Sequence, residues 1–129
     1  MSVLTMAPTL GDLLKFECNP SYCREVVTLK AGTNYPLGAV LGRITASGHY
    51  RLAPAALVAG DDGAEIASAV LTEAVDASAG DAIGVVLARG PVILSQLVLT
   101  FDASVDLPAE RTAKITQLAA LGLVARATS

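Results

Sequence analysis

The chain has 129 residues, which favours a single domain, and its net charge of −3 without any cluster of Lys or Arg argues against binding to nucleic acid. It contains no run of 18 apolar residues and no basic N-terminal region followed by an apolar core, so we expect neither a transmembrane helix nor a secretory signal. Yet 53% of the residues are hydrophobic and only 16% are charged, which is more apolar material than a small monomer usually hides, so we expect an obligate oligomer.

The first part of the chain is predicted to form an arm, residues 1–12, ahead of a single β-rich domain, residues 13–129. The arm is uncharged up to Asp12 and has no regular period, so three interpretations remain open: a loose leader, a strand of the domain's own sheet, or a segment that adds to a partner's sheet edge. In the third interpretation, the candidate binding residues run from the arm into the first strand. They are Val3, Leu4, Met6, Pro8, Leu10, Leu13, Leu14 and Phe16.

Short apolar segments recur along the domain, separated by turns rich in Gly, Pro, Asn, Asp and Ser. This pattern is typical of short β-strands. Residues 31–34 are expected to break the second strand, and residues 60–63 are expected to form an exposed loop. Strands are expected at residues 13–17, 25–29, 39–45, 49–52, 66–71, 83–88 and 92–94, with residues 97–101 extending or following the last.

Residues 75–94 are expected to form the centre of the domain. The run 83–88 is rich in Val and Ile and contains Gly84, which disfavours a helix, so we expect a strand that is buried on both faces. Arg89 is the one charge inside the apolar part of this segment, and we expect it to pair with Asp76 or Asp81 or to lie at a subunit contact. The structural or interface candidates are Asp76, Arg89, Gly90 and Pro91.

The pattern changes to helical spacing after Asp106. Pro108 suits the first helical turn, an acidic residue follows near the positive end of the helix dipole, and Gly122 is the expected C-terminal cap, so a helix is predicted over about 108–121. Residues 123–125 are expected to return to the sheet. The sequence therefore predicts a mainly β fold, barrel-like or β-clip-like, with one C-terminal helix.

Side chains that carry chemistry are few. His49 is the one histidine and stands beside a predicted hairpin turn, where we expect a half-exposed residue rather than a catalytic base. Asp61, Asp62 and Glu65 lack the twelve-residue pattern of a calcium loop and are expected to form a solvated turn. No glycine-rich phosphate-binding motif is present. We therefore expect no enzyme activity, no cofactor and no metal site.

The two cysteines are expected to be free thiols in a reducing compartment, with a local disulfide or half of a metal site as alternatives. With one histidine, Cys18 and Cys23 cannot fill a tetrahedral zinc site without carboxylates.

Several of these segments, in this order, resemble the lambda-type head decoration proteins of tailed bacteriophages. The resemblance covers about residues 11–126, and the chain departs from the best-known members in having two cysteines near its N-terminus and no Trp. The matching segments are residues 13–17, 22–29, 31–32, 37–42, 69–71, 75–76, 81, 85–91 and 118–123.

The resemblance implies a structural protein without catalytic activity. It implies a homotrimer that binds the phage major capsid protein on the outside of the expanded head, at three-fold and quasi-three-fold positions. It also implies an N-terminal arm that becomes ordered on the capsid and a stabilised head that resists the pressure of packaged DNA. We expect the protein on the virion surface, and in the host cytoplasm during assembly, with no direct contact to nucleic acid or membrane.

Two other classes remain open from the residues alone. One is a small β-barrel enzyme or ligand-binding domain, which would need a cleft with convergent polar groups. The other is a carrier domain of the biotinyl type, which needs a lysine at a hairpin tip. Lys15, Lys30 and Lys114 are badly placed for that role.

Overall fold

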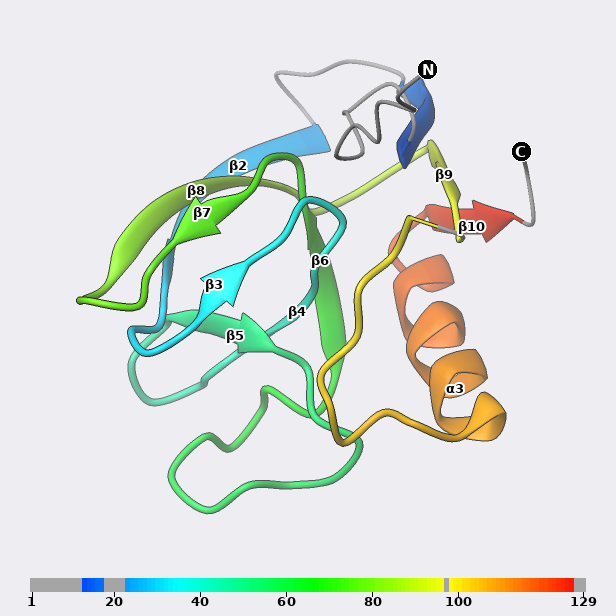
Figure 1. Cartoon of the computed structure of the whole chain (residues 1–129). Helices are drawn as coiled ribbons and strands as arrows, with labels where there is room; N and C mark the ends of the chain where they lie inside the picture. The colour runs from blue at the N-terminus through cyan, green and yellow to red at the C-terminus, as the bar shows by residue number, and fades with distance from the viewer. Residues whose placement is uncertain (1–12, 18–22, 97, 127–129) are drawn as a thin grey trace, which may run out of the picture.

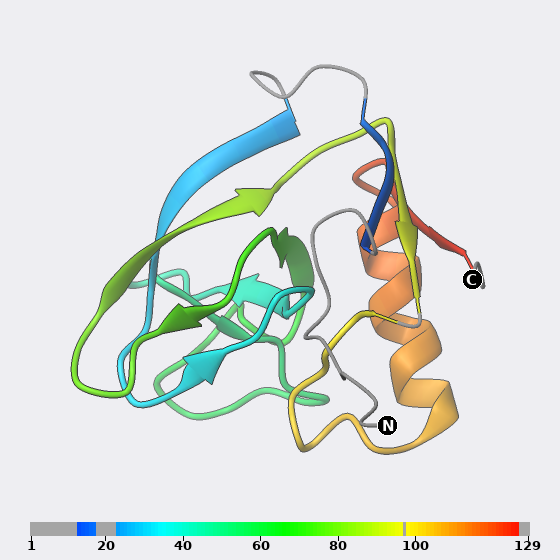
Figure 2. The same cartoon turned by 45° about the horizontal axis from the view of Figure 1, so that its top comes forward.

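The computed structural model describes residues 13–17, 23–96 and 98–126, and it is mainly β with one helix near the C-terminal end (Figure 1). The predicted fold class is confirmed. Five strands close into a barrel, and a three-stranded sheet lies with the helix on one side of it (Figure 2). A further two-stranded sheet joins β3 and β7.

The barrel strands follow one another in the spatial order β2-β5-β4-β6-β8. Their bounds are β2 Arg24–Leu29, β4 Val40–Arg43, β5 Tyr50–Leu52, β6 Ala67–Leu71 and β8 Ala82–Leu87. The β2–β5 pair is parallel, and the other neighbours are antiparallel. A core cluster fills this part of the molecule, which we call the barrel cluster. Its buried members are Leu29, Tyr35, Ala39, Leu41, Ala69, Leu71, Ala77 and Val86.

Gly84 lies in the middle of β8, close to two side chains of the barrel cluster. A Cβ at that position would lie 3.0 Å from the side chains of both Leu29 and Leu71. Such contacts are closer than packed carbon atoms normally approach one another. The same glycine that disfavours a helix in the sequence therefore makes room for the barrel cluster.

The second sheet has the order β1-β9-β10, with β1 at one edge. Its strands are β1 Leu14–Glu17, β9 Val92–Ser95 and β10 Leu123–Arg126; β1 runs antiparallel to β9, and β10 runs parallel to it. A second core cluster gathers residues of this sheet, the helix and the barrel strands. We call it the side cluster. Its buried members are Leu13, Cys23, Val40, Ala53, Ala67, Val70, Leu87, Val92, Leu94, Leu99, Leu118 and Leu123.

The helix, α3, spans Pro108–Ala119. Glu110 Oε1 accepts a hydrogen bond of 3.2 Å from the backbone N–H of Leu107, which satisfies one of the free donors at the helix start. After the helix, Gly122 takes a φ of +85°, the left-handed conformation that commonly ends helices, and the chain enters β10. The predicted helix is confirmed, but it ends at Ala119 rather than at residue 121.

Two polar side chains attach α3 to the barrel. Lys114, only 2% exposed, donates from Nζ to the backbone carbonyl of Glu65, and Gln117 Oε1 accepts from the N–H of Ala67 at 2.7 Å. Burial lowers the pKa of Lys114, because an ammonium group loses its hydration there. Since the two side chains are three residues apart, they lie on the same face of the helix, toward β6.

Two expectations about the strands are wrong. The run 83–88 is not buried on both faces, because Ile83 is 70% exposed. Residues 98–101 form no strand; Thr100 makes an isolated bridge with Ala39. The expected break after the second strand is confirmed, because β2 ends at Leu29. The short pair of β3 (Asn34–Tyr35) and β7 (Val75–Asp76) was not predicted.

Candidate functional site

The predicted binding residues divide between two regions. Val3, Leu4, Met6, Pro8 and Leu10 lie outside the described residues. The other three lie at the start of the domain, where Leu13 is fully buried in the side cluster and Leu14 and Phe16 belong to β1. Their function as a binding segment stays a prediction.

The direction of β1 determines where the arm leaves the domain. Leu14 pairs with Leu94 and Glu17 pairs with Val92, so the chain that precedes Leu14 leaves β1 at the end of β9 that leads into Gln96. A bidentate ion pair anchors the other end of β1, because Arg24 Nε and Nη2 donate to the Glu17 carboxylate at 2.7 and 2.8 Å. This pair links β1 to β2 of the barrel and raises the pKa of Arg24 above its ordinary value.

Arg89 forms its ion pair with Glu25 of β2. The expected pairing with Asp81 is wrong, because the six residues of β8 separate Asp81 from Arg89, and Asp81 accepts instead from the N–H of Ala31 at 2.8 Å. Asp76 accepts from the N–H and hydroxyl of Ser78, and these hydrogen bonds lower its pKa.

Gly90 and Pro91 lie where β8 passes into β9, and the peptide bond between them is cis. The N–H of Gly90 donates to the Leu121 carbonyl at 2.9 Å, and the N–H of Val92 donates to the Gly122 carbonyl at 3.0 Å. A Cβ on Gly90 would overlap the backbone of Gly122. This glycine therefore has a structural role: it lets the β8–β9 connection pack against the end of α3.

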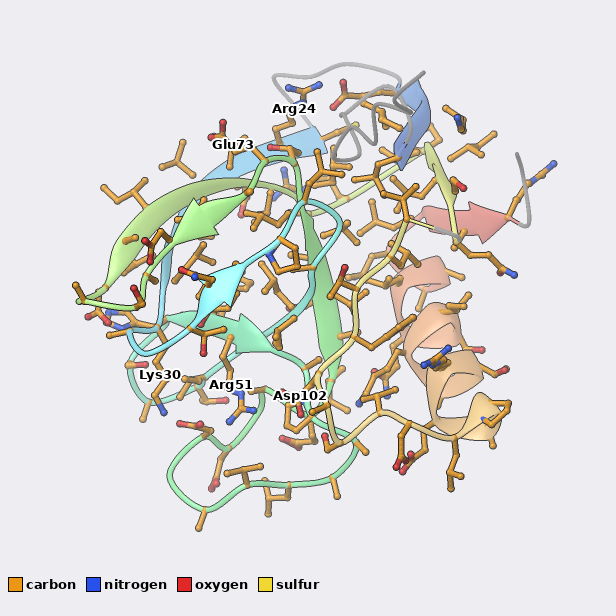
Figure 3. All side chains as sticks on the ribbon, in the orientation of Figure 1. Arg24, Lys30, Arg51, Glu73 and Asp102 are labelled. Atoms are coloured by element: carbon orange, nitrogen blue, oxygen red, sulfur yellow. The ribbon has the colours of Figure 1, made fainter. Side chains whose placement is uncertain are left out.

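A network of ion pairs that the sequence did not reveal lies below the barrel in the view of Figure 3. It joins Arg51 of β5 to three loops, which carry Lys30, Asp61 and Asp102. Asp61 is buried, not part of a solvated turn as expected. It accepts from Lys30 Nζ at 2.9 Å and from Arg51 Nη1 at 2.8 Å, and these two bonds lower its pKa. Arg51 also reaches Asp102 at 3.4 Å. Because the cations hold this carboxylate ionised, we assign it a structural role.

His49 is half-exposed, as expected. Its Nδ1 lies 3.6 Å from the Asp81 carboxylate, which is longer than an ordinary hydrogen bond.

Hydrophobic side chains lie exposed on the outer surface of the β2–β8 pair. Val26 opposes Val85 and Thr28 opposes Ile83, so all four side chains point to one face, and Val26 and Ile83 are 69% and 70% exposed. On the same face, Leu87 is fully buried by the side cluster. We call the uncovered part, made by Val26, Thr28, Ile83 and Val85, the outer β2–β8 face.

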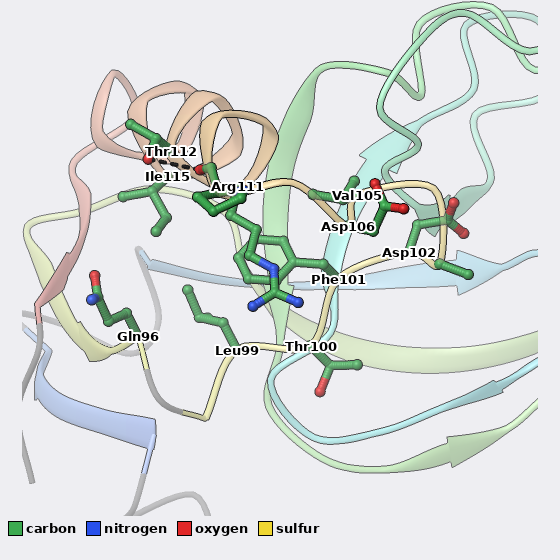
Figure 4. A pocket seen from close by; sticks show the side chains of 12 residues that line it. Gln96, Leu99, Thr100, Phe101, Asp102, Val105, Asp106, Arg111, Thr112 and Ile115 are labelled. Carbon is green, nitrogen blue, oxygen red and sulfur yellow. Dashed lines mark hydrogen bonds between the residues drawn. The ribbon is translucent and has the colours of Figure 1, made fainter.

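A groove of about 680 Å³ lies between α3 and the segment that leads to it (Figure 4). We call it the α3 groove. Three charged side chains line it: the Arg111 guanidinium lies 5.8 Å from the centre of the Phe101 ring, Asp102 binds Arg51, and Asp106 lies near them.

Within residues 13–17, 23–96 and 98–126, no group of three or more His, Cys, Asp or Glu side chains could hold a metal ion. In the same part of the chain, no helix has the length and apolar character needed to cross a membrane. Cys23 is buried with a free thiol, and its relation to Cys18 falls outside the described residues.

Comparison with known proteins identifies a family whose model matches the chain. No curated protein matches the chain. The family model described as bacteriophage lambda head decoration protein D matches residues 3–123, which covers nearly the whole chain, including most of the predicted arm. The mainly β fold and the exposed apolar face agree with this match. The chain belongs to the bacteriophage lambda head decoration protein D family.

Proposed function

We propose that this protein is a structural, non-enzymatic component of a phage virion that binds the outside of the expanded head as a homotrimer, at three-fold and quasi-three-fold positions. The family supports the role in capsid decoration and the location on the capsid. The match over residues 3–123 is the observation that carries the proposal. The protein would be in the host cytoplasm during assembly and would bind the major capsid protein of the head.

Self-association is supported by the apolar surface. The outer β2–β8 face exposes Val26 and Ile83 on the solvent side of a barrel whose interior is already filled. Contiguous apolar patches of this kind mark protein–protein contacts. We propose that copies of the chain meet through this face.

The arm would provide the contact with the head. Residues 1–11 are uncharged and contain Val3, Leu4, Met6 and Leu10, and we propose that they add to a sheet edge of a capsid subunit. Three arms on one trimer bind with avidity, so each contact can be weak. Binding to the expanded lattice alone stabilises that lattice by mass action and helps it to resist the pressure of packaged DNA.

Removal of the arm tests this role. We predict that a variant lacking residues 2–12 keeps the fold, because Leu13 and the rest of the side cluster remain, but no longer co-sediments with expanded heads of the phage that encodes the chain. Light scattering should give the variant the same oligomer mass as the full chain. Undiminished co-sedimentation of the shortened chain would refute the role of the arm.

A further inference from the structure

β2 has a full neighbouring strand on one side only. It pairs with β8 continuously from Arg24 to Leu29, whereas its pairing with β5 on the other side consists of Leu29 and Tyr50. On that side, no described strand pairs with residues 24–28, so the barrel is closed at one end of β2 and open along the rest. In Figure 2, β2 runs along the rim of the molecule with β8 beside it. We call this side of residues 24–28 the β2 edge.

The alternation of the β2–β8 ladder determines which backbone groups face the β2 edge. In an antiparallel pair, residues that exchange hydrogen bonds with the partner strand alternate with residues whose backbone groups point away from it. The N–H of Ala88 donates to the carbonyl of Cys23 at 2.8 Å, and the N–H of Lys30 donates at 2.8 Å to β5, away from β8. Both bonds set the same alternation, in which the backbone N–H and C=O of Arg24 and Val26 point to the β2 edge.

The β2 edge lacks the features that usually prevent an edge strand from pairing with another chain. Such features include a proline, a β-bulge, a charge at the edge or a very short strand. β2 has six residues, no proline and a continuous register with β8. Its charged side chains are held within the chain: Arg24 binds Glu17. Glu25 binds Arg89. Val26, in contrast, is 69% exposed.

We propose that an extended segment of a second copy of the chain pairs with the β2 edge through backbone hydrogen bonds. This inference rests on the proposed self-association and specifies how the copies meet. A second copy is the occupant because the β2 edge is continuous with the outer β2–β8 face: Val26 contributes its backbone to the edge and its side chain to the face. Strand addition and burial of apolar side chains then act in one contact.

The symmetry of a trimer restricts what the added segment is. A three-fold ring is built from heterologous contacts, in which two different surfaces of the chain meet. Antiparallel pairing of two β2 edges with each other would instead give a two-fold dimer. The segment that pairs with the β2 edge therefore comes from another part of the neighbouring copy.

A proline in β2 tests the backbone contact. Val26→Pro removes one N–H from the β2 edge and leaves the ladder with β8 intact, because Val26 does not donate to β8, and edge strands tolerate proline at such positions. Val26→Ala is the matched control, since it shortens the side chain but keeps the N–H. We expect the proline to raise the dissociation constant of the oligomer about tenfold more than the alanine, as for one lost hydrogen bond. Equal dissociation constants would overturn the proposal.

Hydrogen exchange of the unmodified full chain tests the same contact even if the proline variant fails to fold. Amide exchange is followed by NMR at concentrations above and below the one at which the oligomer dissociates. Val27, which bonds to β8, should exchange slowly in both states, whereas Arg24 and Val26 should exchange about tenfold more slowly in the oligomer. Equal rates for Arg24 and Val26 in both states, fast or slow, would overturn the proposal.

The mass in solution separates this inference from the proposed function. If the oligomer is a trimer and Val26→Pro dissociates no more readily than Val26→Ala, self-association stands and the pairing at the β2 edge is wrong. A dimer mass would indicate two paired β2 edges and would contradict the heterologous contact. A monomer mass of the unmodified chain at every concentration would overturn self-association and this inference together. Binding of the arm to heads is measured by co-sedimentation, and its failure would not count against the β2 edge.

Discussion

Asp61 is the residue whose surroundings differ most from what its sequence position suggests. It follows a glycine in a run of Gly and Asp, which is typical of a solvated loop, yet it is buried between Lys30 and Arg51. The cations come from positions 31 residues and 10 residues away in the chain, so no local pattern links them to Asp61. For the same reason, the pairing of Arg89 with Glu25, at a separation of 64 residues, could not be read from the sequence.

We predict that Asp61→Asn lowers the free energy of unfolding by about 2 kcal/mol at pH 7, since hydrogen bonds to charged groups contribute roughly that much. The two cations lower the pKa of Asp61 below 3.8, so its contribution is complete above that pH and disappears as the pH falls through the folded-state pKa. The difference between the two proteins should therefore shrink in acid. Urea denaturation at several pH values measures it.

Asp62→Asn provides the control for this substitution. Asp62 is the exposed neighbour, so the same change of charge there should alter stability by less than about 0.5 kcal/mol. If Asp62→Asn lowered the free energy of unfolding as much as Asp61→Asn, the assigned role of the network would be contradicted. A loss from Asp61→Asn that does not change with pH would contradict it as well.

At the scale of elements, the sequence predicted most strands and the helix because their periodicity and turn residues are local signals. The barrel strands and β9 lie close to the expected ranges, and α3 begins at Pro108 as expected. The expectation that β8 is buried on both faces was wrong, because apolar composition does not show whether another element covers a given face. Leu87 is covered, whereas Ile83 is exposed. The pair β3–β7 was missed because strands of two residues carry no period.

The contact between Gly90 and Gly122 joins the barrel to the unit formed by α3 and the second sheet. We predict that Gly90→Ala lowers the free energy of unfolding by about 2 kcal/mol, as is typical of an added methyl group in a tightly packed site. The methyl group would overlap the Gly122 backbone, and the hydrogen bonds from Gly90 and Val92 to that turn would lengthen. Thermal or urea denaturation of the full chain measures the loss.

Gly80→Ala is the matched control. Its Cβ would meet nothing within 4 Å, and its φ is not in the left-handed region, so stability should change by less than about 0.5 kcal/mol. A Gly90→Ala protein as stable as the Gly80→Ala protein would show that the two units do not depend on this contact.

At the scale of the whole molecule, composition predicted an excess of apolar material but not its location. Much of it fills the two core clusters, and part of the remainder is exposed on the outer β2–β8 face. The binding role of the arm was also inferred from composition, and the structure adds the direction in which the arm leaves the domain. The α3 groove could not be predicted, because it forms between segments whose relative placement is set by the long-range packing of α3.

We predict that Ile83→Asp converts the proposed trimer into monomers without unfolding the domain, because a carboxylate buried at a subunit contact loses its hydration. The side chain is 70% exposed in the single chain, so the fold itself tolerates the change. Multi-angle light scattering gives the mass. Leu57→Asp, at a similarly exposed residue away from the β2–β8 pair, should leave the trimer mass unchanged.

A trimer mass that survives Ile83→Asp would place the subunit contact elsewhere on the molecule. A monomer mass for the unmodified chain at micromolar concentration would contradict self-association in solution.

The stability of the expanded head tests the central claim most directly. Calorimetry of empty expanded heads, titrated with the full chain, measures the temperature at which the lattice comes apart. If the protein binds and stabilises the expanded lattice, this temperature should rise with the concentration of free protein and level off at saturation, whereas unexpanded heads should show no change. An unchanged transition temperature in expanded heads at saturating protein would contradict the account.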